Sequence, residues 1–372
     1  MNSSGGQLDW REFLARPRLP AASPEILDDL ARSPVLITGA GGSIGSALAL
    51  RLAQVTHSGL VLLDSSENNL LWLERALDTQ RDASPRAAEE PTLLLSDARD
   101  PDALENLFSK HRPQIVFHAA AYKHVPFLEK HPLAAIANNV FSTEVVTAAA
   151  AEHGAHIVLL STDKAVEPVS VMGATKRVAE EIVLAHSGAV LRLGNVLGST
   201  GSATEVFARQ IAQGEPLTVT DPAARRYFLT LDEAVDLLLL AAVHRDRNAV
   251  LAPALETQHR IAELAAFMAR ALAPGREILI RFTGLRPGDK LEEQLCSGSE
   301  QAAPLVGGGL ILVQSPRPDP ARFAQGLAAM RAALRVSDLA AALADLCALV
   351  PGFRPSQTVL ALAQSSRERA CV

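Results

Sequence analysis

Asp163 and Lys164 bring a carboxylate and an amine together directly after a short apolar run, 157–160, that predicts a buried strand. Such a pair could carry general acid–base chemistry. A helical pattern opens at Met172, and Lys176 follows one turn later on the same apolar face. A lysine inside an apolar stripe is a poor choice for packing, and ligands of open parallel sheets bind beyond the carboxyl ends of the strands. We therefore predict that Asp163, Lys164 and Lys176 line one site.

A glycine-rich turn predicts a second ligand contact near the start of the chain. The strand pattern 35–38 is followed by Gly39, Gly42 and Gly45, in G-x-x-G-x-x-G spacing, and by a helical run. Glycines at such a turn let backbone N–H groups approach a pyrophosphate at the N-terminus of the helix. A further apolar run ends at Asp64, where a carboxylate can accept hydrogen bonds from the adenosine ribose. The combination predicts a dinucleotide site. Asp64 favours NAD over NADP, but the two serines after it leave the choice between the two cofactors open.

Two more strand ends complete the predicted cofactor contacts. The run 92–96 ends at Asp97, which could meet the adenine edge. The run 115–118 leads into three alanines whose small side chains let a cofactor approach the backbone closely. The residues predicted to bind the cofactor by these arguments are Gly39, Gly42, Ser43, Ile44, Gly45, Asp64, Asp97, Ala98, Ala119, Ala120 and Ala121.

Apolar runs alternate with helical patterns from residue 35 to 193, which is typical of an α/β fold with a Rossmann-like doubly wound parallel sheet. The last of these runs is 189–193. Beyond it, loops that carry arginines predict a smaller C-terminal substrate-binding region, and 298–306 has the composition of a linker or loop. The predicted regions are an N-terminal extension that clasps the main domain (1–32), an NAD-binding Rossmann domain (33–195), a substrate-binding region (196–300) and a C-terminal helical cap (301–372).

Composition limits the classes of function. The chain has 372 residues, 48% hydrophobic and 20% charged, as in globular proteins. Its formal charge of −6 argues against a nucleic-acid binder, which usually carries a basic stripe. The cysteines Cys296, Cys347 and Cys371 have neither a close pair nor metal-ligand spacing. The first residues lack the pattern of a signal peptide, and the apolar patches fall short of a membrane span. We expect a cytoplasmic protein with reduced thiols, no metal and no membrane span.

Four other polar residues leave their role open. His118 and His124 follow the fourth strand pattern and could be ligands, although a histidine there is more often a hydrogen-bonded structural residue. Asn138 and Asn139 on the next helix could bond either backbone or ligand.

Five sequence blocks make the chain resemble a known family. These blocks are similar to those of the UDP-N-acetylglucosamine 4,6-dehydratases of bacterial polysaccharide biosynthesis, a branch of the extended short-chain dehydrogenase/reductases, and are far more specific than a glycine turn. The extension also resembles the segment before the catalytic domain of long, membrane-anchored members, so the chain looks like a free-standing catalytic half. The blocks are Ala120–Pro126, Ser161–Val166 with Met172–Arg177, Arg192–Ser199, Arg226–Phe228 and Phe282–Leu291.

The resemblance implies an NAD-dependent elimination. NAD⁺ takes a hydride from C4 of the sugar, the ketone acidifies the C5 proton, the C6 hydroxyl departs, and the hydride returns to C6. The family assigns the acid to the aspartate and the base to the lysine, here Asp163 and Lys164, while Lys176 matches the lysine that holds the nicotinamide ribose. Guanidinium groups suit the diphosphate of a UDP-sugar. The catalytic set is Thr162, Asp163, Lys164, Met172 and Lys176, and the substrate contacts are Lys123, Asn195, Arg226 and Arg286.

Two features complicate this mechanism. An ion pair between Asp163 and Lys164 would favour the charged form of each, the opposite of what an acid and a base need near neutrality. We therefore expect the site to direct the two side chains to different atoms of the sugar. Met172 occupies the place of the tyrosine base of most short-chain dehydrogenases, and a thioether cannot take a proton. Methionine there is itself a feature of the long-form dehydratases, and Asp163 or a water that it positions is the preferred base at C4.

Two other functions stay open. A nucleotide-sugar 4-epimerase would use the same fold and hydride step without losing water. A non-catalytic protein that senses dinucleotides would keep only the cofactor site, which the joint presence of Asp163, Lys164 and Lys176 disfavours. The expected partners are a UDP-sugar and, from the resemblance, further copies of the chain in a homo-oligomer.

Overall fold

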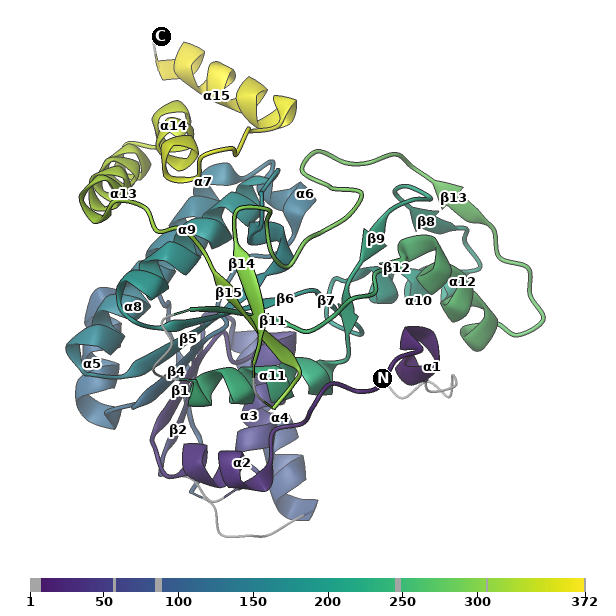
Figure 1. The fold of residues 1–372 in the computed structure, drawn as a ribbon, viewed down its shortest axis with the longest axis horizontal. Helices are drawn as coiled ribbons and strands as arrows, with labels where there is room; N and C mark the ends of the chain where they lie inside the picture. Colours follow the sequence, from purple (N-terminus) through teal and green to yellow (C-terminus); the bar gives the residue numbers. More distant parts are fainter. Residues whose placement is uncertain (1–7, 56–57, 84–88, 245–248, 306, 371–372) are drawn as a thin grey trace.

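A nine-stranded sheet forms the centre of the molecule (Figure 1). The structure, a computed structural model, describes residues 8–55, 58–83, 89–244, 249–305 and 307–370. Seven strands run parallel in the order β3-β2-β1-β4-β5-β6-β11, and two antiparallel strands, β15 and β14, extend the β11 edge. The strands are β1 Val35–Thr38, β2 Leu60–Asp64, β3 Thr92–Leu95, β4 Ile115–His118, β5 His156–Thr162, β6 Ala189–Leu193, β11 Val250–Pro253, β14 Gln301–Pro304 and β15 Leu310–Gln314.

This strand order is that of a doubly wound sheet, and it confirms the predicted Rossmann-like fold. The six strands predicted from apolar runs all form. The order reverses between β1 and β4, whose carboxyl ends therefore border the crevice where ligands of such sheets bind. Both the glycine turn after β1 and the alanines after β4 lie at this edge.

Helices cover both faces of the sheet, and their apolar sides give two core clusters. On one face, α2 Pro24–Ala31, α3 Ser43–Leu52 and α11 Leu231–Val243 pack against the central strands. On the other face lie α5 Pro101–His111, α8 Ser142–Glu152 and α9 Val171–Ala185. The other elements at the sheet are the long helix α4 Glu67–Ala83 and the short elements α6 Val125–Leu128, α7 Pro132–Ala135, η1 Ile136–Phe141 and η2 Asp163–Ala165.

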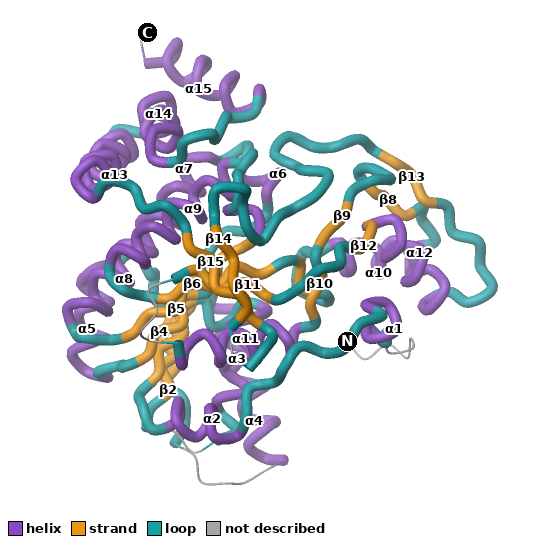
Figure 2. The backbone as a smooth tube through the Cα atoms, in the orientation of Figure 1, coloured by secondary structure: helices purple, strands orange, loops and turns teal. Residues whose placement is uncertain are grey.

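A smaller region stands beside the carboxyl edge of the sheet, as Figure 2 shows. Three short strand pairs and two helices enclose its own apolar core. The N-terminal helix, α1 Trp10–Leu14, joins this core through Phe13, whose ring lies 5.5 Å from that of Phe267. The pairs are β7 Asn195–Val196 with β10 Phe228–Leu229, β9 Arg225–Arg226 with β12 His259–Arg260 and β8 Leu217–Val219 with β13 Ile280–Phe282, and the helices are α10 Ala203–Gln213 and α12 Ile261–Leu272.

The N-terminal extension spans both parts of the molecule. Beyond α1, Arg16 forms an ion pair with Glu233 at 2.6 Å, and Arg18 forms one with Asp236 at 2.7 Å, both on α11. The chain then enters α2, whose buried leucines join the core under the sheet. The extension thus clasps the main domain through charge pairs and apolar packing.

Three C-terminal helices lie at the top of Figure 1 and pack over α7 and α9. They are α13 Pro320–Arg335, α14 Leu339–Leu349 and α15 Gln357–Ala370, and they lie in the region predicted as a helical cap. The interpretation of 298–306 as a linker or loop is wrong for 301–304, which forms the edge strand β14 by pairing with β15, while residue 306 lies outside the described residues. The residues of β14 are all exposed, and their sequence lacks the apolar alternation of a strand. Only the pairing with β15 makes this segment a strand.

One helical stretch, Pro132–Glu152, is long and apolar enough to cross a membrane by length and composition. The prediction that all apolar patches fall short of a membrane span did not include this stretch. It is long because α7, η1 and α8 follow one another without a break. In the structure, 56% of its apolar window is buried inside the domain, where it packs against the sheet and α9. Its apolar composition therefore matches its place in the core.

Candidate functional site

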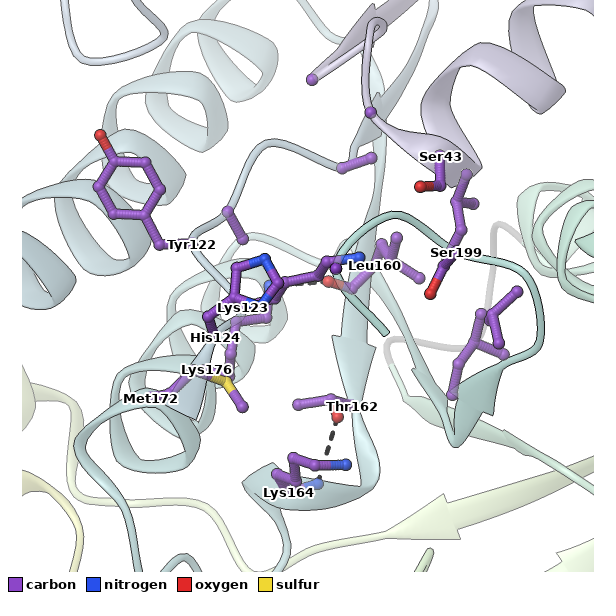
Figure 3. Close-up of a pocket in the computed structure, with 18 of the residues that line it drawn as sticks. Ser43, Tyr122, Lys123, His124, Leu160, Thr162, Lys164, Met172, Lys176 and Ser199 are labelled. Carbon is purple, nitrogen blue, oxygen red and sulfur yellow. Dashed lines mark hydrogen bonds between the residues drawn. The ribbon is translucent and has the colours of Figure 1, made fainter. Parts of the chain in front are cut away.

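A pocket of about 600 Å³ opens at the carboxyl ends of β1, β4, β5 and β6 (Figure 3). Its walls come from the glycine turn, the loop after β4, the end of β5, the start of α9 and the loop after β6. Thirteen of the residues predicted for the site line it, which are Gly39, Gly42, Ser43, Ile44, Gly45, Ala119, Ala121, Lys123, Thr162, Lys164, Met172, Lys176 and Asn195.

The glycine turn fits a dinucleotide because its backbone has no room for side chains. Gly39 has φ of +68°, and a Cβ there would lie 2.6 Å from the backbone nitrogen of Ala120. A Cβ on Gly45 would lie 2.1 Å from the carbonyl oxygen of Gly39. Helix α3 starts with Gly42 as N-cap, without a side-chain cap, so its first N–H groups face the pocket from a positive helix end. This is the arrangement that binds a pyrophosphate.

Four predicted cofactor residues do not line the pocket. The Asp64 carboxylate accepts the backbone N–H groups of Gly41 and Ser66, at 2.9 and 2.8 Å, and so holds the turn in shape. Asp97 pairs with Arg99 at the surface, which holds the Asp97 pKa below its usual value. Ala98 and Ala120 also lie outside the pocket lining. The cofactor contacts of these four residues stay predictions.

Lys176 lies in the pocket wall although it is only 4% exposed. Its Nζ donates a hydrogen bond of 2.7 Å to the carbonyl oxygen of Leu160 on β5, drawn in Figure 3. Burial lowers the Lys176 pKa to about 8, against the opposing pull of the Glu180 carboxylate. Met172 stands one turn earlier on the same wall, as the helical spacing predicted.

Asp163 and Lys164 are paired with each other at the end of β5. Thr162 caps the turn η2 by accepting the Lys164 N–H, and this brings Lys164 Nζ to 2.9 Å from Asp163 Oδ1 and 3.0 Å from Asn195 Oδ1. The Thr162 hydroxyl donates to the same Asp163 oxygen. Asp163 is fully buried and does not line the pocket, while Lys164 does. The two side chains thus contact each other in this structure, and their reach to different atoms of a bound sugar stays a prediction.

The loop after β4 supplies the opposite wall. Asn139 holds it by accepting the N–H of Tyr122 at 2.8 Å and donating to its carbonyl at 3.0 Å, so this amide bonds backbone. Asn139 belongs to a π-helical turn, a feature frequent at functional sites. Burial lowers the pKa of Lys123 and also that of His124, which the neighbouring Lys123 lowers further. Both side chains point into the pocket (Figure 3).

The arginines predicted for the diphosphate lie outside the pocket lining. The guanidinium of Arg226 donates to the carbonyl oxygens of Arg225, Leu291 and Lys290, at 2.6 to 3.0 Å, and ties the loop before Glu293 to β9. Arg286 is exposed and bonded to Asp289 within its own turn. Since local partners use these donors, the diphosphate contacts of Arg226 and Arg286 stay predictions.

His118 has the structural role that sequence reasoning left open. Its ring bonds the hydroxyls of Thr38 at 2.7 Å and Thr143 at 3.1 Å, and its burial, with Lys176 nearby, lowers the pKa to about 3. Within the described ranges, no group of three or more His, Cys, Asp or Glu residues is arranged to hold a metal ion.

The loop after β7 was missed as a pocket wall. Ser199, Gly201 and Ser202 line the pocket, and Ser43 at the start of α3 bonds the backbone N–H of Thr200 at 3.0 Å. The signal was present in the two glycines of the block 198–202, which permit positive φ of +74° and +70°. This contact closes the pocket between the sheet and the smaller region.

A buried network of charges stands behind β5. We define it as Ser161, Arg177, Glu180, Arg192 and Glu300. Arg192 is fully buried and donates to both carboxylates at 2.8 to 3.0 Å. Burial opposes ionisation of the two acids, but Arg192 prevails, so the Glu180 pKa falls and the Glu300 pKa falls to about 2. The network connects the pocket-lining Ser161 to the edge hairpin.

Comparisons with known proteins show the family to which the chain is similar. Residues 35–311 match the family model described as polysaccharide biosynthesis protein. The chain is 36% identical over 298 residues to the probable polysaccharide biosynthesis protein EpsC of Bacillus subtilis (strain 168), with 78% of this chain and 49% of that protein covered. It is 35% identical over 303 residues to the capsular polysaccharide biosynthesis protein CapD of Staphylococcus aureus, covering 79% and 50%. The chain thus spans about half the length of these curated relatives.

Other relatives have different printed activities. The chain is 34% identical over 283 residues to UDP-glucose 4-epimerase of Rickettsia canadensis (strain McKiel), covering 72% of this chain and 79% of that protein. Pen from Bacillus thuringiensis has a TM-score of 0.70 at 28% identity, covering 77% of this chain and 90% of that one. The dTDP-glucose 4,6-dehydratase DesIV from Streptomyces venezuelae, with NAD and TYD bound, has a TM-score of 0.61 at 21% identity, covering 71% and 88%. The last likeness shows the fold alone.

Proposed function

The chain belongs to the polysaccharide biosynthesis protein family, and on that premise we propose that it catalyses the NAD-dependent 4,6-dehydration of a UDP-N-acetylhexosamine, with UDP-N-acetylglucosamine as the expected substrate. The main observation behind the proposal is that Lys164, Lys176 and the glycine turn line one pocket. Asp163 lies directly behind Lys164 and is hydrogen-bonded to it. An acid and an amine at the end of one strand serve an elimination, which needs both a proton donor and a proton acceptor.

NAD bound along the glycine turn would supply the hydride chemistry, taking a hydride from C4 and returning it to C6. Lys176 would hold the nicotinamide ribose through its Nζ, which now bonds the Leu160 carbonyl. Lys164 would remove the C5 proton, and Asp163 would give its proton to the departing C6 hydroxyl. Because the two side chains are bonded to each other, binding of the sugar has to separate them before each can reach its own atom.

The base for the C4 hydroxyl is assigned to Asp163, directly or through a water, because Met172 cannot accept a proton. Lys123, Asn195, Arg226 and Arg286 are proposed to bind the UDP-sugar. For Arg226 this requires release of carbonyl oxygens that it now bonds. NAD is proposed over NADP because Asp64 would repel a 2′-phosphate on the ribose.

A 4-epimerase is the second candidate, since relatives named UDP-glucose 4-epimerase are 34% identical to the chain. Mass spectrometry separates the two reactions. The pure protein is incubated with NAD and UDP-N-acetylglucosamine, and the nucleotide sugar is analysed after the reaction. A dehydratase yields a 4-keto-6-deoxy product that has lost one water, whereas an epimerase yields a product of unchanged mass. Conversion without loss of water would overturn the dehydratase proposal.

A further inference from the structure

Glu293 is a buried carboxylate next to the catalytic pair, on a loop whose function the sequence did not indicate. It is only 3% exposed and lies just beyond the block that ends at Leu291. Three cations surround it. Its Oε1 is 3.9 Å from Lys164 Nζ and 4.0 Å from Arg226 Nε, and its Oε2 is 3.2 Å from Lys290 Nζ. Burying a carboxylate costs free energy unless its charge is paired with a cation or serves a function.

The loop that carries Glu293 is fixed to the catalytic turn. Lys290 Nζ donates a hydrogen bond of 2.7 Å to the carbonyl oxygen of Val166, directly after η2. On the other side, Gln258 donates to the backbone carbonyl of Glu293 at 2.9 Å, and Arg226 holds the carbonyls of Lys290 and Leu291. The position of the Glu293 carboxylate is therefore set by both the sheet and the smaller region.

Lys164 has two anionic neighbours at unequal distances. It contacts Asp163 at 2.9 Å and faces Glu293 at 3.9 Å. A charge-assisted hydrogen bond is about 2.7–2.9 Å long, so a shift of about 1 Å would let Lys164 exchange the first partner for the second. The second oxygen of Asp163 has no hydrogen-bond partner among the described residues. This oxygen of Asp163 can therefore accept a further hydrogen bond.

We propose that Glu293 is a positioning residue that gives Lys164 a second counter-ion, so that Lys164 can leave Asp163 when the sugar binds. Without Glu293, separating the pair would leave the Lys164 ammonium with only the Asn195 amide as a fixed polar partner. With it, the two catalytic groups can reach different atoms while the charges stay balanced. This inference rests on the proposed function and names the residue that solves its ion-pair difficulty.

The first test compares Glu293→Gln with the matched control Glu292→Gln, whose side chain is 61% exposed. With NAD and UDP-N-acetylglucosamine, we expect Glu293→Gln to lower kcat roughly 10- to 100-fold, below the roughly 10²–10⁴-fold of a direct acid or base. We expect KM for the sugar to change less than about threefold, since ground-state binding is kept. Glu293→Asp should recover part of kcat, and Glu292→Gln should match the wild type. Unchanged kcat in folded Glu293→Gln would overturn the proposal.

A second measurement is independent of turnover. Acetic anhydride acylates Lys164 only in its neutral form, and peptide mass spectrometry measures the rate at that residue. Removing the Glu293 charge should make Lys164 react severalfold faster than in the wild type and in Glu292→Gln at the same pH. Equal rates would contradict the proposal even if the enzyme dehydrates its substrate. If the wild type dehydrates no UDP-sugar but the rates differ as expected, the proposed function fails and the link between Glu293 and Lys164 stands.

Discussion

Two charge clusters, one that includes Ser161 in β5 and one that begins directly after this strand, differ in how completely their polar atoms are hydrogen-bonded. The buried network behind the strand includes Ser161, and the pocket-side cluster, which we define as Asp163, Lys164, Arg226, Lys290 and Glu293, begins two residues later. In the network, each oxygen of Glu180 and Glu300 accepts at least two hydrogen bonds. In the pocket-side cluster, one Asp163 oxygen has no partner within the described part of the chain.

This difference separates a group of charges that maintains the fold from one that can change partners. A fully bonded buried network resists rearrangement, because any movement leaves a charge uncompensated. The pocket-side cluster keeps spare acceptor capacity and alternative partners at 3.9 to 4.0 Å, so its members can move at smaller cost. Charge changes in the network should therefore affect stability, and charge changes in the pocket-side cluster should affect turnover.

The largest effect is expected from Asp163→Asn, which removes the acid and keeps the shape of the side chain. Turnover of UDP-N-acetylglucosamine should fall by roughly 10²–10⁴-fold, the usual contribution of a positioned acid or base. The free energy of unfolding should fall by less than the roughly 3–5 kcal/mol of a fully buried pair, because Lys164 keeps Asn195 and partial exposure to water. Mass spectrometry of the product and urea unfolding measure the two quantities. Wild-type turnover in this variant would remove Asp163 from the mechanism.

The reverse outcome is expected from Arg192→Leu in the buried network. Breaking a buried ion pair by removing one partner costs about 3–5 kcal/mol, because Glu180 and Glu300 lose their principal counter-ion. Urea unfolding should show this loss in the free energy of unfolding. The control is Arg81→Ala, whose half-exposed pairs with Asp78 and Glu90 should contribute little to the free energy of unfolding. A loss no larger than that of the control would show that the network does not stabilise the fold.

Local patterns predicted most of the fold. Apolar runs of strand length predicted six of the seven parallel strands, all except β11, and helical periodicity placed Met172 and Lys176 on one face. The antiparallel edge was not predicted, because β14 is exposed over its whole length and its state depends on pairing with β15. Such a strand has no signal of its own in the sequence.

The candidate site could be predicted only where its residues follow strand ends. The glycine turn, Thr162 and Lys164 were found because parallel strands bring their carboxyl ends to one edge. Glu293 and the network residue Glu300 were missed, because Glu293 lies more than 100 residues from Lys164 and Glu300 lies more than 100 residues from Arg192, so that both resemble surface charges in the sequence. Arg226 was assigned to a ligand, yet backbone carbonyls occupy its donors. Tertiary partners of charged side chains leave no local pattern.

The smallest effect is a pH dependence that originates in the network. The folded-state pKa of Glu300 is about 2, below its ordinary value of 4.5, because hydrogen bonds and the charge of Arg192 outweigh its burial. A depressed pKa contributes stability above the unfolded value, and that stability is lost as the pH falls from 4.5 towards 2.

Glu300→Gln should therefore be less stable than the wild type at pH 7, by about 1–2 kcal/mol, because an amide replaces a charge-assisted acceptor. Its free energy of unfolding should also fall less steeply between pH 4.5 and 2 than that of the wild type. Thermal unfolding at a series of pH values measures both, with the exposed Glu89→Gln as control. Parallel curves for Glu300→Gln and the wild type would mean that the Glu300 charge makes no net contribution. The completely bonded network would then fix the geometry of β5 without stabilising the fold, and the contrast between the two clusters would lie in mobility alone.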